Sequence, residues 1–490
     1  MTQRQTACAV LGVCLVVALF GISQPSVTVG YAQISTNTPR VPPTTLPTNT
    51  PRVMATPSLP PMATEYPLET PRPSPTPRPT WVIEGTYTPP AKPPVTAIPI
   101  RIERPTTTDD VVTVLLLGSD TTEPNYISRT DLMVVVAINR TAGTVTMLHL
   151  PRDLMVYAPN DTMRKLNTVA AQGIAMYGAG GAGRLMKETL DYNFGIKVDF
   201  YARVGFEQFK TIIGALGGLN ITVDCGIQGN RLINPDDEQQ DLNDPANYEV
   251  YTMSIGKYTL SPYMALWYVR ARGSTSDMDR GRRQIEVLRA MWRQSRDAGL
   301  LTQLTVLWPE LQKIVETDMT LADVLGIAPL ALSIDPVNIQ RIFVVQNVHF
   351  TQWYTADTGS FSWLPKREAW LDVAKNLITP PRNRLSTETP RVAIRAATGW
   401  EGYAETAGDR LSWEGFAVSY PKDQEVAKRD FTVLIDYTGG AKPDSLETIR
   451  KALRLGEAQI ATRPDPNAAT DFEVIIGRDY MSSCLYTLPQ

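Results

Sequence analysis

VVTVLLLG, from Val111 to Gly118, and DLMVVVAIN, from Asp131 to Asn139, are short apolar runs rich in β-branched residues. Runs of this length and composition predict buried β-strands. TVTMLHL, from Thr144 to Leu150, predicts a third strand, and the RTAG segment before it suits a hairpin turn. The folded part of the chain therefore begins with three successive strands.

Helical and extended patterns alternate beyond the third strand. GRLMKETLDYNFG predicts a helix that ends at Gly195. FYARVGFEQFKTIIGALGGLNITVDC, which starts at Phe200, predicts a strand, a helix and another strand. A long helix is expected from about Asp279 to Ser295, and the acidic insertion from Pro235 to Tyr248 is interpreted as a solvated loop. Strands interleaved with helices indicate an α/β sheet that is covered on both faces.

The sequence before Val111 has a different character. Residues 7–22, ACAVLGVCLVVALFGI, are uncharged and mostly apolar, which indicates an export signal that is either cleaved or kept as a membrane anchor. From Pro25 to Pro105 the chain holds 21 of its 39 prolines, so this stretch predicts a disordered stalk. In polyproline II, about eighty residues could reach roughly 250 Å. We therefore expect a single-pass protein of the cell membrane whose globular domains lie outside the cytoplasm.

These changes in composition divide the 490 residues into five segments. They are a signal or anchor (1–24), a Pro/Thr-rich stalk (25–108), a central domain (109–380), a short linker (381–391) and a C-terminal domain (392–490). The last segment alternates strand and helix patterns and predicts a small α/β domain. It has no evident catalytic constellation, so we interpret it as an accessory interaction module.

Composition excludes several classes of function. The net charge of −3, without a basic domain, argues against a general nucleic-acid binder. The only two histidines, His149 and His349, are far apart in sequence, so neither a histidine base nor a multi-histidine zinc site is expected. No CxxC pair occurs. Cys225 and Cys484 either form a disulfide, as an oxidising setting would allow, or are separate buried thiols.

Polar side chains occur where the predicted strands end. Active sites of α/β sheets collect at strand ends, so these side chains are expected to converge. The residues are Asp120 in GSD, Arg129 and Asp131 in SRTD, Arg152 and Asp153 in LPRD, and Lys165 and Asn167 in KLN. Asp120 and Asp131 could supply oxygen ligands to Mg²⁺, which bridges carboxylates to substrate phosphates.

Five arginines lie within fourteen residues of the segment YVRARGSTSDMDRGRRQ. Arg270 and Arg272 are two apart and would share one face of an extended segment. Arg280 and Gln284 are four apart and would share one face of a helix. Planar guanidinium groups bind phosphate oxygens in pairs, so three of these arginines are interpreted as one wall of a pyrophosphate site. Arg282 is expected at the surface.

The motifs GSD, SRTD, LPRD, KLN, GFEQF with LGGLNITV, MALWYVRAR and DMDRGRRQ follow one another between Val111 and Ser295. In this order they resemble the LytR-CpsA-Psr family of cell-wall glycopolymer ligases, with a weaker continuation to about Pro380. TGWEGYAETAGDRL and VIIGRDY resemble the small LytR-type C-terminal domain often appended to it, although the usual NGTG-like start reads AATG here. The resemblance implies a mixed α/β fold with an apolar tunnel for a polyprenyl chain. The apolar strands and the helix around Leu185 to Phe194 could line it, with ordinary core packing as the alternative, which must hold for most of these residues.

The resemblance also implies an activity, a phosphotransferase reaction in cell envelope assembly. A glycopolymer would pass from a polyprenyl-pyrophosphate carrier to peptidoglycan by Mg²⁺-assisted phosphoryl transfer. By motif position, Asp120 and Asp131 resemble the metal ligands. The expected catalytic set is Arg129, Arg152, Asp153, Arg270, Arg272, Arg280 and Gln284, and Lys165, Asn167 and Arg283 are assigned to substrate binding. Either Asp131 or Asp153 could be the general base.

Two other functions are hypotheses for this sequence. One is a polyprenyl-pyrophosphate binding protein or pyrophosphatase that performs no transfer. The other is a regulator that acts on DNA, but an export signal and a stalk would keep the domain away from nucleic acid. The expected partners are therefore the lipid-linked glycan, peptidoglycan and, through the N-terminal segment, the membrane. The segment between Arg272 and Arg280 and the acidic insertion are idiosyncratic, and the identity of the glycopolymer does not follow from the sequence.

Overall fold

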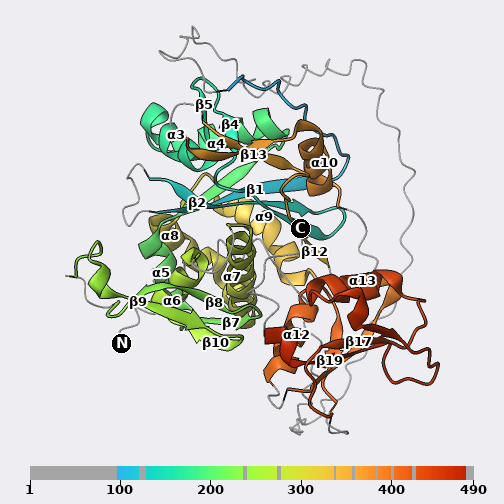
Figure 1. Ribbon diagram of the computed structural model, residues 1–490. Coiled ribbons are helices and arrows are strands. Elements are labelled where there is room, and N and C mark those ends of the chain that lie inside the picture. Colours follow the sequence, from blue (N-terminus) through green and yellow to red (C-terminus); the bar gives the residue numbers. More distant parts are fainter. Residues whose placement is uncertain are drawn as a thin grey trace, which may run out of the picture. The chain divides into compact units, whose positions relative to one another are not determined.

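The computed structural model describes residues 96–120, 128–235, 240–272, 277–335, 338–355, 359–380, 385–398, 402–421 and 426–481 (Figure 1). The predicted export signal, most of the predicted stalk and Cys484 lie outside these residues. Within the described ranges no helix is both long and apolar enough to cross a membrane. Cys225 is buried and its sulfur accepts a hydrogen bond from Arg454 Nη1 at 3.7 Å, so its pairing with Cys484 stays a prediction.

The central domain is built on a sheet of six strands in the order β11-β6-β1-β2-β3-β12. The strands are β1 (Val111–Ser119), β2 (Thr130–Asn139), β3 (Thr144–His149), β6 (Phe200–Val204), β11 (Glu316–Thr317) and β12 (Ile339–Ile342). β1, β2 and β3 pair antiparallel in the predicted order, while β6 runs parallel to β1 and β12 parallel to β3. The sheet is therefore mixed, and the prediction of three opening strands is confirmed.

Both faces of this sheet are buried. Val114 and Leu116 of β1 face one apolar core, whereas Leu115 and Leu117 face the other, and all four are at most 5% exposed. Successive residues of a strand point to opposite faces, so a strand covered on both sides must be apolar at every position. This explains why the first strands are continuous apolar runs instead of alternating ones.

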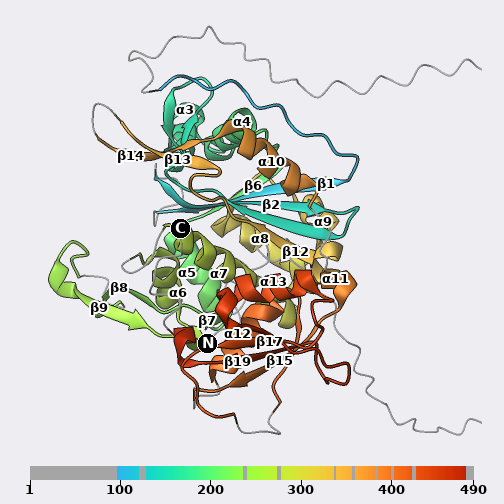
Figure 2. The ribbon, with the colours of Figure 1, turned by 45° about the vertical axis from the view of Figure 1, so that its right-hand side comes forward.

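Helices cover the two faces in separate groups, as Figures 1 and 2 show. On one face lie α3 (Val169–Tyr177), α4 (Gly181–Phe194) and α10 (Arg367–Ile378). On the other lie α5 (Phe206–Ala215), α6 (Pro262–Arg270), α7 (Asp277–Asp297), α8 (Leu304–Ile314) and α9 (Leu321–Ser333). α4 ends at Gly195, whose φ of 66° lies in the left-handed region, as its sequence predicted.

Four two-stranded ribbons complete the central domain. They pair β4 (Met155–Tyr157) with β5 (Met163–Lys165), β7 (Leu219–Val223) with β10 (Gly256–Leu260), β8 (Ile227–Leu232) with β9 (Tyr248–Met253), and β13 (Phe350–Tyr354) with β14 (Phe361–Pro365). Short 3₁₀ turns occur at Leu166–Thr168, Pro245–Asn247 and Leu300–Gln303. The described part of the acidic insertion joins β8 to β9 and is mostly exposed.

The packed chain begins before residue 109, where the central domain was predicted to start. Ile102 is 3% exposed, and its backbone N–H donates to the carbonyl of Tyr192 at 3.0 Å. Arg101 and Arg104 both pair with Asp191 of α4. A single buried isoleucine flanked by two ion-paired arginines holds this segment, and average composition does not reveal so local an anchor.

The C-terminal domain has its own five-stranded sheet, in the order β16-β15-β19-β17-β18. Its strands are β15 (Arg391–Ala396), β16 (Ala417–Ser419), β17 (Val433–Asp436), β18 (Ile460–Thr462) and β19 (Phe472–Ile476). Its helices are α12 (Gly402–Ser412) and α13 (Pro443–Ala452), with a 3₁₀ turn at Glu457–Gln459 and another at Arg478–Met481. α11 (Leu385–Glu388) lies within the predicted linker, where Glu388 accepts a hydrogen bond from Ser445 N of α13 at 2.8 Å.

The crossing of α3 and α4 generates a stability prediction. A Cβ placed on Gly173 would lie 2.1 Å from the carbonyl oxygen of Gly181, so neither backbone can move aside cheaply. Gly173→Ala should lower the free energy of unfolding by about 1–3 kcal/mol in urea titrations. In the control Gly214→Ala, the new Cβ meets only Pro262, at an ordinary 3.6 Å. Gly214→Ala should leave the free energy of unfolding unchanged or raise it by up to about 1 kcal/mol, because position 214 is helical. Equal effects of the two substitutions would contradict the packing argument.

Candidate functional site

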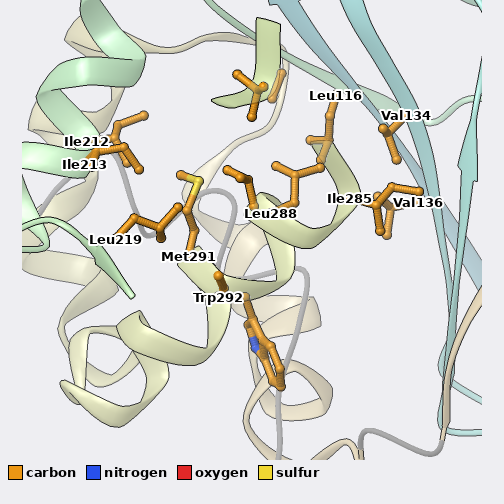
Figure 3. Close-up of a cluster of buried hydrophobic side chains, with 14 of the residues drawn as sticks. Leu116, Val134, Val136, Ile212, Ile213, Leu219, Ile285, Leu288, Met291 and Trp292 are labelled. Carbon is orange, nitrogen blue, oxygen red and sulfur yellow. The ribbon is translucent and has the colours of Figure 1, made fainter. Parts of the chain in front are cut away.

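A cavity of about 890 Å³, including its open mouth, lies between the central sheet and α5, α6 and α7. Most of its wall is apolar, with side chains from Leu116, Leu132, Val204, Phe206, Phe209, Ile212, Leu266, Val269, Val287, Leu288, Met291 and Val315. Figure 3 shows Leu116, Ile212 and Leu288 among the side chains gathered on this face of the sheet. Its polar lining includes Asp131, Arg270, Arg280 and Gln284. A mostly apolar chamber with a few charged groups suits an amphiphilic ligand.

The helix expected to line a lipid tunnel does not line this cavity. Leu185, Leu190 and Phe194 of α4 are completely buried in the core on the opposite face of the sheet. Of the two alternatives for this helix, ordinary core packing is therefore the one that the structure supports. Apolar spacing along a helix shows that one face is buried, but it does not show whether that face meets a cavity or close-packed side chains.

Antiparallel pairing of β1 with β2 brings Asp120 and Asp131 to the same end of these two strands. Ser119 is paired with Thr130, and the backbone N–H of Asp120 donates to the carbonyl of Arg129 at 3.0 Å. Partial burial raises the pKa of the Asp120 carboxyl, and the negative charge of Asp131 raises it further. The two carboxylates are thus close enough to repel each other, which is the electrostatic arrangement that a divalent cation relieves.

Arg152 connects the turn after β3 to this carboxylate pair. Its Nη1 lies 2.7 Å from Asp131 Oδ1, and its Nε lies 3.4 Å from Asp153 Oδ2. Lys165 Nζ is 3.3 Å from the other oxygen of Asp153. The backbone of Asn167 donates to the carbonyl of Arg152 at 3.0 Å, so the KLN segment supports the LPRD turn and does not line the cavity.

Arg270 and Arg272 reach the site by a different route from the predicted one. The segment YVRAR is not extended throughout, because α6 continues to Arg270 and only the two residues after it leave the helix. The guanidinium of Arg270 lies over the ring of Phe206, 4.4 Å from its centroid, and borders the cavity. Arg272 Nη2 lies 3.9 Å from Asp131 Oδ2. The prediction of a shared extended face is therefore wrong, although both arginines lie near the site.

Arg280 and Gln284 project from one face of α7 into the cavity, as their spacing predicted. Arg280 is 1% exposed, and its Nη2 pairs with Asp277 Oδ1 at 2.7 Å. Its buried Nε has no hydrogen-bond partner among the described residues. Burial lowers the pKa of Arg280 against the charge of Asp277, and the positive charge of Arg272 lowers it further. The cavity thus has a buried donor within a group of mutually repelling cations, which an anion would stabilise.

The remaining arginines of the cluster have structural partners. Arg282, expected at the surface, is buried and pairs with Asp224 at 2.8 Å and Asp279 at 3.0 Å. Arg283, assigned to substrate binding, donates to the carbonyl groups of Tyr268 and Ala271 at the end of α6. Burial of Arg282 contradicts its expected surface position. Arg283 does not line the cavity, and its assignment to substrate binding stays a prediction. Asp224 is 58 residues from Arg282, and the partners at the end of α6 are backbone groups, so the local sequence does not reveal them.

Two residues near the cavity were not predicted. His149, at the end of β3, lies against Gly281, where a Cβ would be only 2.4 Å from the imidazole Cε1. Burial lowers the pKa of His149 to about 4, with a further contribution from Arg280 and an opposing hydrogen bond with Gln284. The neutral ring therefore packs behind Gln284. A glycine inside a long polar helix was the available sequence signal for this close approach.

Asp120 and Asp131 would offer few protein ligands to a metal ion. Among the described residues no group of three or more His, Cys, Asp or Glu side chains could hold a metal ion. Asp120 and Asp131 are two oxygen donors beside cationic side chains. Mg²⁺ commonly takes only one or two protein carboxylates and completes its shell with water and substrate phosphate, so this pair fits Mg²⁺.

Comparison with known proteins gives two family matches. The LytR_cpsA_psr family matches residues 91–373, and the family described as LytR cell envelope-related transcriptional attenuator matches residues 389–480. Together these matches cover both domains described above.

Individual relatives match part of the chain. The polyisoprenyl-teichoic acid–peptidoglycan teichoic acid transferase TagT of Bacillus subtilis is 30% identical over 232 residues, covering 46% of this chain and 66% of its own. The transferase TagU of Oceanobacillus iheyensis is 28% identical over 214 residues, covering 43% of this chain and 59% of its own. This chain therefore spans about three fifths of the length of these relatives. The crystal structure of B. subtilis TagT aligns over 57% of this chain and 95% of that one, with a TM-score of 0.40 and 24% identity.

The buried position of His149 predicts a pH dependence of stability. Its folded pKa of about 4 lies below the ordinary 6.5, so between these values the unfolded chain binds a proton that the folded chain does not. The stability that the protein has with His149 neutral is fully present above pH 6.5. It is lost as the pH falls through 4, by up to about 3 kcal/mol. In urea titrations, His149→Gln should lose stability less steeply than the wild type over this window. Parallel pH profiles would contradict the assignment.

Proposed function

Because the chain belongs to the LytR_cpsA_psr family, we propose that it transfers a glycopolymer from a polyprenyl-pyrophosphate carrier to peptidoglycan. The observation that carries this proposal is one cavity whose mostly apolar wall meets Arg270, Arg280 and Asp131. The names of TagT and TagU describe transfer of teichoic acid from a polyisoprenyl carrier to peptidoglycan, and they support the same reaction class here. Both substrates belong to the cell envelope. We accordingly include in the proposal an extracytoplasmic site and a membrane-anchored N-terminal segment.

The apolar wall supports a lipid carrier instead of a soluble nucleotide donor. Side chains from β1, β2, β6, α5, α6 and α7 form it, and they offer hydrocarbon contact over most of the chamber. Burial of an isoprenoid chain there would remove apolar surface from water at about 25 cal/mol per Å². A polyprenyl tail in the chamber would leave its pyrophosphate beside Arg270 and Arg280.

The cationic side chains support a pyrophosphate head group. Arg270 and Arg280 border the cavity. Arg152 and Arg272 lie close to the carboxylate of Asp131, which also borders it. Guanidinium groups donate paired hydrogen bonds to phosphate oxygens, and the unpartnered Nε of Arg280 is one such donor. Fixed cations stabilise the charge that spreads over the phosphoryl oxygens during transfer.

Bound Mg²⁺, held by Asp120 and Asp131, would supply further neutralisation of pyrophosphate charge. The chain's own residues would orient the head group so that a peptidoglycan hydroxyl faces the glycan-proximal phosphorus. The new oxygen–phosphorus bond forms as the phosphoanhydride bond breaks, and polyprenyl phosphate leaves with the bridging oxygen. Of the two candidate bases, Asp131 borders the cavity and Asp153 does not. Asp131 is therefore the candidate nearer to the head group. Because Asp131 would also hold Mg²⁺, it would be a weak base, which suffices where the hydroxyl proton is released only late in the transfer.

Arg152→Ala provides the test of this site. Arg152 is partly exposed and forms its ion pairs at the surface of the turn, so the variant should fold. With full-length protein, Mg²⁺, peptidoglycan and a radiolabelled polyprenyl-pyrophosphate-linked disaccharide, we expect transfer to fall by about 100- to 1000-fold. The matched control is Arg184→Ala, which removes a surface arginine that pairs with Glu188 within α4 and lies over the ring of Tyr177 of α3, on the opposite face of the sheet from the cavity. It should retain wild-type activity.

The acceptor distinguishes the proposed transferase from the alternative function. Label on peptidoglycan supports transfer. Release of the disaccharide phosphate to water, with none on peptidoglycan, would instead establish a pyrophosphatase, and binding without release would establish a lipid-pyrophosphate binding protein. Equal activity of Arg152→Ala and Arg184→Ala would refute the site assignment under either function.

A further inference from the structure

The helix α7 presents two functional faces. Arg280, Gln284, Leu288 and Met291 line the large cavity. Glu286, Arg289 and Arg293, on another side of the helix, border a second and smaller cavity that is closed by residues of the C-terminal domain. Within each set the residues are three or four positions apart, so each set lies on one face of the helix. One helix therefore separates the candidate site from the C-terminal domain.

The principal contact on the outer face is Trp413, the first residue after α12. The guanidinium of Arg289 lies over its indole at 3.9 Å from the ring centroid, and that of Arg293 lies at 4.9 Å. Arg289 Nη2 also donates to the carbonyl of Trp413 at 2.6 Å. Trp292 approaches the same ring, with 6.3 Å between centroids. Two stacked cations and a direct hydrogen bond make this a specific docking contact.

Carboxylates of the C-terminal domain balance buried cations of the central domain. Glu414 pairs with Arg341 of β12, and Asp409 pairs with Arg293 of α7 at 3.0 Å. Burial acts to raise the pKa of Glu414, but the charges of Arg341 and Arg410 outweigh it and hold that pKa at about 2. Burial lowers the pKa of Arg289 well below its usual value. Buried cations are costly without such partners, so the two domains depend on each other electrostatically.

A chain of ion pairs continues to the first turns of α7. Arg410 Nε lies 3.6 Å from Asp224 Oδ2, and Arg282 Nη1 lies 2.8 Å from Asp224 Oδ1. Arg282 is flanked by Gly281 and Arg283, and it is two residues from Arg280. The C-terminal domain thus contacts α7 both at its middle, through Trp413, and near the turn that carries the cavity-facing arginine.

We propose that the C-terminal domain is a positioning element that holds α7 so that Arg280 and Gln284 point into the cavity. Trp413 and Glu414 are its positioning residues. This inference rests on the proposed function for its kinetic consequence, but the docking itself does not. A helix transmits rotation along its length, because its backbone hydrogen bonds connect each residue to the one four positions away. Loss of the outer contacts would let α7 turn or slide, which disperses the phosphate-binding groups without removing the apolar wall.

Glu414→Gln and Trp413→Phe test the proposal in the full-length protein. The matched control is Glu405→Gln, which breaks the exposed pair between Glu405 and Lys257 at 2.7 Å across the same two domains. Each variant is first compared with the wild type by circular dichroism. We expect Glu414→Gln to lower kcat by about tenfold, within the usual range of coupling between sites. Affinity for geranylgeraniol, a short prenyl probe without the pyrophosphate, should change less than about twofold, because the apolar wall is intact.

Hydrogen exchange of the peptide covering Asp277–Asp297 gives a readout that needs no activity. Glu414→Gln should speed amide exchange in α7, Trp413→Phe should have a smaller effect, and Glu405→Gln should match the wild type. If the wild type shows no transfer, the proposed function fails while exchange still decides the docking. Wild-type exchange and kcat in Glu414→Gln and in the more disruptive Trp413→Ala would overturn the inference. A fall in affinity as large as that in kcat would also overturn it.

Discussion

The structure depends on the burial of α7, a helix in which ten of the 21 residues are charged. Arg280, Arg283 and Arg289 are each at most 1% exposed. Buried guanidinium groups are tolerated only where carboxylates or carbonyl groups satisfy them. Some partners lie within α7 itself, such as Asp277 and Asp279, but others belong to neighbouring elements, and these fix the placement of those elements. Arg283 holds the end of α6, Arg282 holds Asp224, and Arg289 holds the C-terminal domain.

The cavity follows from the same arrangement. The first face of the sheet, under α3, α4 and α10, is filled with close-packed side chains, whereas α5, α6 and α7 enclose a chamber on the other. Antiparallel pairing of β1 and β2 places two carboxylates at its edge, and α7 places Arg280 there. Apolar surface for a lipid and cations for its head group thus meet at one point. Under the proposed function, the C-terminal domain stabilises this geometry from the opposite side of α7.

Local sequence patterns predict much of this fold. Apolar runs identified β1, β2 and β3, and Gly195 identified the end of α4. Residues at strand ends also predicted the neighbourhood of Asp120, Asp131 and Arg152, because antiparallel neighbours must bring those ends together. The spacing of Arg280 and Gln284 identified one face of α7, because helical periodicity is itself a local property.

Other features depend on contacts that no local pattern contains. YVRAR alternates like a strand, but Ser261 caps a helix whose first residue is Pro262, and that helix continues through Arg270. Burial of Arg282 depends on Asp224, 58 residues away. Both faces of β1 are equally apolar, so the sequence does not indicate which face has the cavity.

Photolabelling with a prenyl pyrophosphate that carries a diazirine in its hydrocarbon tail tests directly whether a lipid tail lies in the cavity. We expect label in Phe206–Ala215, Pro262–Arg270 and Asp277–Asp297, displaced by unlabelled geranylgeranyl pyrophosphate. Label concentrated in Gly181–Phe194, on the other face of the sheet, would contradict it.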